Sequence, residues 1–180
     1  MSSSAEFGSL RHLAGRFFGA LWPGGPRPHD EAWATGWLLA GEQGLWARMS
    51  GPDRRHAVGV ARDTLRLLDG GPTPGREIVA SALLHDVGKV EAGLGTVGRA
   101  VVTAVAMVTG RRRLVASDAG GRWRGRARTY LTHDRIGAAL LEEAGSDPVT
   151  VAWAREHHQD PATWSVDRRL ADALKAADGD

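Results

Sequence analysis

The sequence predicts an all-α fold, and three observations support this prediction. Apolar residues recur at the three- and four-residue spacing of an amphipathic helix in segments along the whole chain. Clusters of proline and glycine separate these segments, as at 23–26, 69–72 and 145–148. No segment shows the alternation of apolar and polar residues that is typical of a half-buried strand. With 180 residues, the chain has the length of about one domain.

The N-terminal third, residues 1–49, is expected to form a short helical extension. Its apolar spacing predicts one amphipathic helix over about 5–21, and a linker rich in proline and glycine follows at 23–28. Two shorter helices are expected around 33–39 and 42–49, where tryptophans supply large apolar faces. Because the first helix is short and not strongly basic, we expect a cap on the main domain rather than a membrane anchor.

Residues 50–180 form the main predicted domain, and their helix boundaries are clearer. Ser50-Gly51-Pro52 is typical of a helix start, and we expect this helix to run to about Leu68. A second helix is expected from about Arg76 to Val87, with Gly88 as its stop. The remaining helices are expected over 131–144, from Pro148 onward, and after a cap at Ser165.

The composition narrows the classes of function. The chain contains no cysteine, which excludes disulfides, thiolate zinc sites, iron–sulfur clusters and cysteine nucleophiles. Any transition-metal site must therefore use His, Asp and Glu. The longest apolar stretch near the middle, 100–110, is shorter than the roughly 20 residues of a membrane-spanning helix. The N-terminus lacks the apolar region of a secretory signal, so a cytoplasmic protein is expected.

One strongly basic segment stands apart from an otherwise balanced chain of formal net charge +2. Between Arg99 and Arg128 lie eight arginines and one aspartate, Asp118. Four glycines in this segment predict a loop or irregular insertion over about 99–128. The insertion has three interpretations: a solvated loop, a funnel for substrate phosphates, or a contact with nucleic acid or membrane. Nucleic-acid binding is not favoured, since few aromatic residues interleave with the arginines.

Histidine positions are the most informative feature of the sequence. A histidine that faces a helical core is costly unless its ring nitrogens are satisfied, and each one alone fits a hydrogen-bonded core residue. Together they predict a shared site, because ligands from facing helices of a bundle converge. Five histidines lie in or at the ends of four predicted helices, and aspartates accompany them: His56, His85, Asp86, His133, His157, His158 and Asp178. This set exceeds the needs of one metal, so two metals bridged by a carboxylate are expected, with one metal as the alternative.

These residues resemble the HD-domain superfamily of metal-dependent phosphohydrolases over roughly 50–180. His56, His85-Asp86 and Asp178 match its H…HD…D signature, and the string from His85 to Lys89 is similar to its HDxGK form. Three further elements resemble the HD-GYP branch: His133 to Gly137 resembles HxxxG, His157-His158 the paired histidines, and Ala177 to Asp180 the ADxxD segment. The GYP motif is absent, so the chain is nearest to a degenerate branch in which a cyclic-dinucleotide substrate is in doubt.

The resemblance implies an HD-domain-like helical bundle that hydrolyses a phosphomonoester or phosphodiester, expected to be a nucleotide, with metal-activated water. It implies that His56, His85, Asp86 and Asp178 hold one divalent transition metal. Asp86 would bridge to a second metal held by His133, His157 and His158. These ligands suit manganese, iron, zinc, nickel or cobalt without choosing among them.

Two residues of the motif are expected to be catalytic, Asp86 and Lys89. The ammonium of Lys89 would neutralise charge on the phosphoryl oxygens. Arg54 and Arg55, which precede His56, are further candidates for substrate contacts, although a solvated helix face also explains them.

Two other functions remain open at this point. The missing GYP motif and the basic insertion fit a non-catalytic HD-like regulatory module that binds a nucleotide or a protein partner. A helical structural protein with satisfied core histidines is the other alternative.

Overall fold

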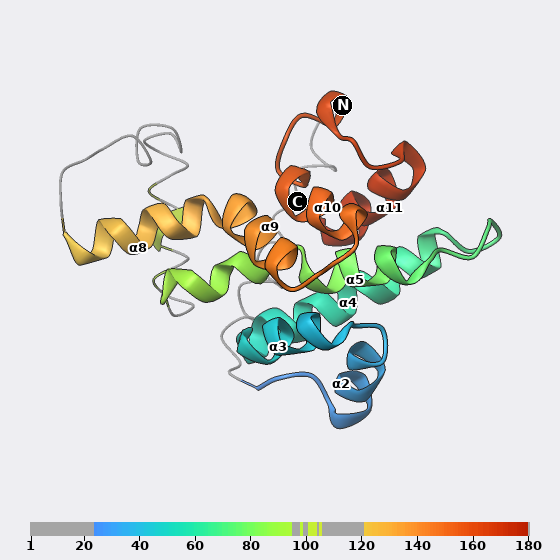
Figure 1. Cartoon of the computed structure of the whole chain (residues 1–180), viewed down its shortest axis with the longest axis horizontal. Helices are drawn as coiled ribbons and strands as arrows, with labels where there is room; N and C mark the ends of the chain where they lie inside the picture. The colour runs from blue at the N-terminus through green and yellow to red at the C-terminus, as the bar shows by residue number, and fades with distance from the viewer. Residues whose placement is uncertain (1–23, 95–97, 99–100, 104, 106–120, 180) are drawn as a thin grey trace, which may run out of the picture.

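The computed structural model describes residues 24–94, 98, 101–103, 105 and 121–179, and all regular structure in this part of the chain is helical (Figure 1). The prediction of an all-α fold is confirmed. The predicted helix over 5–21 lies outside the described residues. The elements are α2 (Pro28–Thr35), α3 (Ala40–Arg48), α4 (Gly51–Leu67), α5 (Arg76–Leu84), the 3-10 helix η1 (Val87–Ala92), α8 (Arg122–Leu131), α9 (His133–Glu143), α10 (Pro148–Glu156), the 3-10 helix η2 (Pro161–Thr163) and α11 (Arg168–Asp178).

The short helix α5 lies at the centre of the molecule. Every residue from Ile78 to Leu84 is buried, as expected for a helix that is apolar on all sides. It packs against α4 on one side and α10 on another. Helix α9 packs in turn on α10 and η1, and α11 packs on α4. The core around α5 includes Trp46, Trp153, Leu141 and Leu174, all at most 2% exposed. The ends of these packed helices therefore meet beside the C-terminal end of α5.

The first two described helices, α2 and α3, cover one side of this core. Their apolar residues Ala34, Leu45 and Trp46 belong to the same hydrophobic cluster as α4 and α5. Glu31 of α2 joins the three helices, because its Oε1 accepts hydrogen bonds from Trp46 Nε1 at 2.7 Å and from Arg54 Nη1 at 2.6 Å. The described part of residues 1–49 thus packs directly on the main helices.

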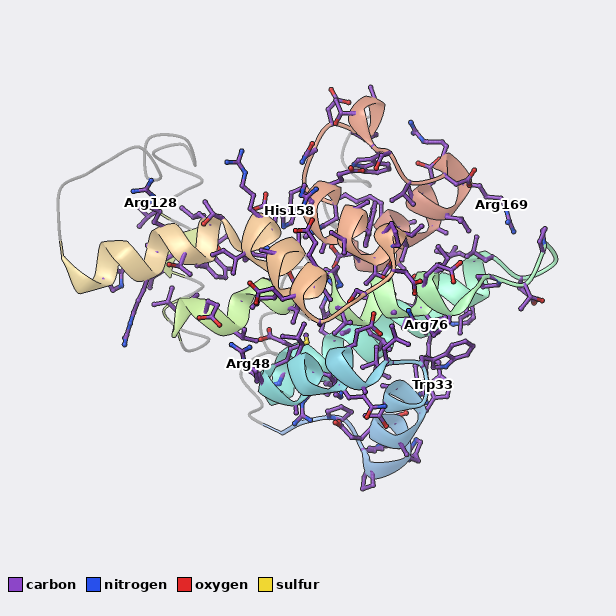
Figure 2. All side chains as sticks on the ribbon, in the orientation of Figure 1. Trp33, Arg48, Arg76, Arg128, His158 and Arg169 are labelled. Atoms are coloured by element: carbon purple, nitrogen blue, oxygen red, sulfur yellow. The ribbon has the colours of Figure 1, made fainter. Side chains whose placement is uncertain are left out.

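A buried ion pair fastens α3 to the start of α5. Glu42 is fully buried, and its Oε2 accepts hydrogen bonds from Arg76 Nη1 at 2.7 Å and from the Leu39 amide at 2.8 Å. Arg76 also pairs with Asp147, which precedes α10, and Figure 2 labels Arg76 in the middle of the helices that it joins. One guanidinium therefore connects three elements of the bundle.

Replacing Arg76 by methionine is expected to lower the free energy of unfolding by about 3 kcal/mol, because it leaves the Glu42 carboxylate buried without its cation. Urea unfolding monitored by circular dichroism measures this loss. The double variant Arg76→Met/Glu42→Gln removes the buried charge and is expected to recover part of the stability. A double variant no more stable than Arg76→Met contradicts the assigned cause.

Two helix boundaries of the main domain differ from the sequence-based predictions. Helix α5 ends at Leu84, and the chain passes through Gly88 as the 3-10 helix η1, which stops at Gly93 with a φ of +57°. Asp167, rather than Ser165, caps the last helix by accepting a hydrogen bond from the Leu170 amide. In both cases a tertiary contact decides the boundary: η1 packs on α9, and Ser165 donates its hydroxyl to Glu156.

The prediction of a loop or irregular insertion over 99–128 is wrong for 101–103, which are helical, and for 122–128, which belong to α8. Gly125 lies within this helix, and a Cβ atom added to it would meet no other atom within 4 Å. No close contact therefore requires a glycine at this position. Ala127 and Leu131 are buried against Ala92 and Leu94 of the η1 region, and this packing stabilises the helix. Figure 1 shows α8 extending from the side of the molecule, and Figure 2 shows Arg128 pointing outward from it.

No helix in the described ranges has both the length and the apolar character to cross a membrane.

Candidate metal centre

The structure brings all seven predicted ligand residues together where several helices end. Most of them lie at helix termini, where a side chain can reach across to a neighbouring element. His56 lies in α4, His85 and Asp86 follow α5, His133 begins α9, His157 and His158 follow α10, and Asp178 ends α11.

One group of ligand atoms lies between α4, α5 and α11. His56, His85 and Asp86 each offer a ligand atom, and these atoms all lie within 4.8 Å of one another. Asp178 completes this group, since its Oδ1 lies 3.0 Å from His56 Nε2 and 3.6 Å from His85 Nε2. The group combines two imidazoles and two carboxylates from three helices.

A second group lies between α9 and the end of α10. His133, His157 and His158 place their ligand atoms within 4.8 Å of one another. The ring centroid of His158 lies 4.0 Å from that of His157 and 5.2 Å from that of His133. His158 is the exposed member, and Figure 2 labels it between α9 and α10.

The carboxylate of Asp86 connects the two groups. Its Oδ2 lies 3.4 Å from Nε2 of His85, and its Oδ1 lies 3.2 Å from Nε2 of His133. The side chain is 7% exposed. One buried carboxylate therefore directs a different oxygen toward each imidazole group, which is the arrangement of a bridging ligand.

The protein backbone fixes the orientation of three of the imidazoles in the same way. Nδ1 of His85 lies 2.9 Å from the carbonyl of Ala82, Nδ1 of His133 lies 2.7 Å from that of Tyr130, and Nδ1 of His157 lies 3.0 Å from that of Ala154. Each of these carbonyls belongs to the last turn of a helix, where it lacks a helical partner. A carbonyl only accepts hydrogen bonds, so each Nδ1 carries a proton, and whenever the ring is neutral its lone pair lies on Nε2.

The Nε2 atoms of these three histidines fit a metal ion. All three are buried and none makes a hydrogen bond of good geometry among the described residues, although Asp86 oxygens lie 3.4 Å from Nε2 of His85 and 3.2 Å from Nε2 of His133. A buried nitrogen without a partner costs about 1–3 kcal/mol, and three in one cluster need a common explanation. A transition metal would supply it, because neutral imidazole nitrogens and carboxylate oxygens are the ligands that such ions take in the absence of cysteine.

The carboxylates of the centre remain ionised despite their burial. Desolvation raises the pKa of Asp86, but the ammonium of Lys89 and the imidazole of His85 outweigh it and hold the pKa well below its ordinary value. For Asp178, desolvation is likewise outweighed by His85 and by the hydrogen bond with His56, so its pKa is also lowered. Two buried negative charges make the centre attractive to cations.

The surroundings shift the pKa values of His157 and His85 in opposite directions. Desolvation lowers the pKa of His157 to about 3, with a further contribution from His85, so His157 is neutral and able to act as a ligand. Desolvation also lowers the pKa of His85, but the adjacent Asp86 and Asp178 carboxylates reverse this and raise it well above its ordinary value. The position at Nε2 of His85 thus favours a positive charge, which a metal ion supplies as well as a proton does.

Two motif glycines bring the halves of the centre into contact. A Cβ atom on Gly88 of η1 would lie 2.0 Å from the carbonyl oxygen of His133 and 2.6 Å from the amide nitrogen of Gly137. A Cβ atom on Gly137 of α9 would lie 3.1 Å from the Gly88 nitrogen. The backbones of η1 and α9 therefore touch, and this contact places Asp86 and Lys89 beside His133.

Lys89 lies on the same carboxylate that connects the two groups. Its Nζ contacts Asp86 Oδ2, and the side chain is 17% exposed. Desolvation lowers the pKa of Lys89, but Asp86 and Tyr130 together outweigh it, so the pKa is raised and the ammonium is retained. Nζ also lies 6.0 Å from the ring centroid of Tyr130. A fixed positive charge is therefore adjacent to the predicted bridging ligand.

Sequence reasoning missed two residues of this region. Tyr130 of α8 accepts the Nδ1 hydrogen bond of His133 and stacks on its ring, with 5.9 Å between centroids. Lys175 of α11 donates from Nζ to the His157 carbonyl at 3.1 Å. A signal existed for Lys175, since it precedes Asp178 by one helical turn and is one of only two lysines. The backbone role of Tyr130 has no sequence signal.

The structure does not bring Arg54 or Arg55 to the centre by any described contact. Arg54 pairs with Glu31 of α2, and Arg55 donates to the carbonyl of Gly24. Residues two positions apart on a helix lie on nearly opposite sides, which explains why Arg54 and His56 diverge. The predicted substrate contacts of these arginines find no support in their positions.

Comparison of the chain with models of protein families, with curated proteins and with solved structures gives no match. The function is therefore inferred from the residues of the centre and their geometry.

Proposed function

We propose that this protein is a metal-dependent phosphohydrolase of the HD-domain kind, which hydrolyses a phosphomonoester or phosphodiester, with a nucleotide as the expected substrate. The single observation that carries the proposal is the buried Asp86 carboxylate, which lies between two imidazole groups and contacts Lys89. This arrangement combines a site for one or two metal ions with a fixed cation beside it.

In this proposal one set of residues binds metal ions, and other groups of the protein orient these ligands and supply charge. His56, His85, Asp86 and Asp178 would hold one ion, and Asp86 with His133, His157 and His158 would hold a second. A bound divalent transition metal supplies a Lewis acid and a source of hydroxide near neutral pH.

The protein contributes orientation and charge. The carbonyls that bind Nδ1 of His85, His133 and His157 keep each Nε2 atom directed into the centre. Lys89 is placed to neutralise negative charge on the phosphoryl oxygens as it develops in the transition state. The exposed His158 marks the side on which solvent, and therefore a substrate, reaches the cluster.

Metal content and metal-dependent turnover of the purified protein test the proposal. We expect elemental analysis to find one or two transition-metal ions per chain, and hydrolysis of p-nitrophenyl phosphate or bis(p-nitrophenyl) phosphate that stops on chelation and returns when metal is restored. A protein that takes up no metal after reconstitution contradicts the proposal. Metal and nucleotide binding without turnover in any metal favours the regulatory-module alternative.

Lys89→Met is expected to lower kcat by about 100- to 1,000-fold while the metal content stays unchanged, because the charge that stabilises the transition state is lost. Steady-state kinetics and elemental analysis of the same preparation measure both effects. Lys89→Arg keeps a cation at this position and is expected to retain more activity. A wild-type kcat for Lys89→Met contradicts the catalytic role of Lys89.

A further inference from the structure

Helix α10 ends at a carbonyl that another helix binds. His157 directly follows the last residue of α10, so its carbonyl oxygen lacks the partner that a longer helix would supply. Lys175 Nζ of α11 donates a hydrogen bond to this oxygen at 3.1 Å, although the two residues are 18 positions apart. A cationic donor at the C-terminal end of a helix is favourable both as a hydrogen bond and toward the helix dipole.

This contact joins two elements that pack on different neighbours. Helix α11 packs chiefly on α4, whereas α10 packs on α9 and α5. The end of α10 carries His157 and His158, and Asp178 lies on α11 three residues after Lys175. Residues three apart on a helix lie on the same side, so Lys175 and Asp178 both face the centre.

We propose that Lys175 is a positioning residue of the metal centre, which holds the end of α10 and the end of α11 in register. The inference rests on the metal centre proposed above. Nδ1 of His157 is bound to the carbonyl of Ala154 in the last turn of α10. The ring therefore follows the backbone of that turn, and Lys175 fixes this backbone relative to the helix that carries Asp178.

The expected consequence lies in metal affinity. Ligand atoms must hold their distances to a metal within about 0.2 Å, which is less than the freedom of an unfastened helix end. Loss of a residue that orients ligands typically lowers metal affinity by about 10- to 100-fold. Loss of Lys175 is expected to fall in this range, since it acts on His157 and Asp178 together.

Co²⁺ titration of the full-length protein tests the inference, followed by visible absorption and by competition with a chromogenic chelator. We expect Lys175→Met to bind Co²⁺ about 10- to 100-fold more weakly than wild type and to show altered absorption bands. Lys175→Arg keeps a cationic donor and is expected to restore most of the affinity. Lys175→Gln keeps only an uncharged and shorter donor, so an intermediate loss is expected.

Arg168→Met is the matched control. Arg168 is another basic residue of α11, but its Nε pairs with the exposed Asp172 at 2.8 Å and its guanidinium lies over Trp164. We expect this variant to bind Co²⁺ as wild type does. Wild-type affinity and spectrum in Lys175→Met, even with reduced thermal stability, overturn the positioning role alone. A wild-type protein that binds no Co²⁺ overturns the metal centre and the inference together.

Discussion

Asp86→Ala is expected to bind no more than a trace of metal and to hydrolyse phosphoesters at the background rate. Asp86 is the only described residue whose two carboxylate oxygens lie within 3.5 Å of imidazoles from both ligand groups. Its removal takes one ligand from each predicted ion and deprives Lys89 of its partner. Elemental analysis and turnover assays on the same reconstituted preparation measure both losses.

The chain contains a matched control for this substitution. Asp134 also directly follows a histidine of the centre, but its Oδ1 accepts a hydrogen bond from the Arg135 amide, and it is in neither ligand group. Asp134→Ala is therefore expected to keep both metal and activity. Asp86→Asn separates charge from size, since an asparagine of the same shape is a weaker ligand without negative charge. Full metal content in Asp86→Ala is the result that contradicts a bridging role.

Gly88→Ala is expected to lower the free energy of unfolding by about 3 kcal/mol and to weaken metal binding. The added methyl group would meet backbone atoms, the His133 carbonyl oxygen at 2.0 Å and the Gly137 nitrogen at 2.6 Å, which cannot rotate away as a flexible side chain can. Separation of η1 from α9 relieves the clash, and it moves Asp86 and Lys89 away from His133. Urea unfolding of the metal-free protein and a metal titration measure the two effects.

Alanine substitutions at two other glycines serve as comparisons for the stability of Gly88→Ala. Gly137→Ala brings its Cβ to 3.1 Å from the Gly88 nitrogen, so a smaller loss of stability is expected. Gly59 is exposed within α4 with nothing near its added Cβ, so Gly59→Ala is expected to stabilise the protein by about 0.5–1 kcal/mol. An unfolding midpoint of Gly88→Ala equal to that of wild type contradicts the close backbone contact.

Several elements follow from local sequence signals and agree with the structure. Helix α4 begins at the predicted Ser50 cap, whose hydroxyl accepts a hydrogen bond from the Asp53 amide. Helix α9 is followed by Gly145 with a φ of +74°, the left-handed conformation that favours glycine. Helix α10 starts at Pro148, as predicted. These signals were sufficient because caps and helix stops act within a few residues.

Other elements were missed because they depend on contacts between distant residues. The end of α5 at Leu84 and the 3-10 path through Gly88 exist where η1 meets α9, and the sequence around Gly88 does not reveal this contact. Helix α8 forms against Ala92 and Leu94, although the glycines of this segment predicted a loop. The contacts of Arg54 and Arg55 with Glu31 and Gly24 likewise depend on how α2 folds back on α4.

The sequence by itself determined the all-α class and the list of side chains that meet in the centre, because helical periodicity and ligand chemistry are properties of residue types and their order. Only the tertiary structure decided that Asp86 lies between two imidazole groups and that backbone carbonyls direct three Nε2 atoms inward. It also decided that Lys175 joins α11 to α10. These features require distances between residues far apart in the chain, and helix packing sets those distances.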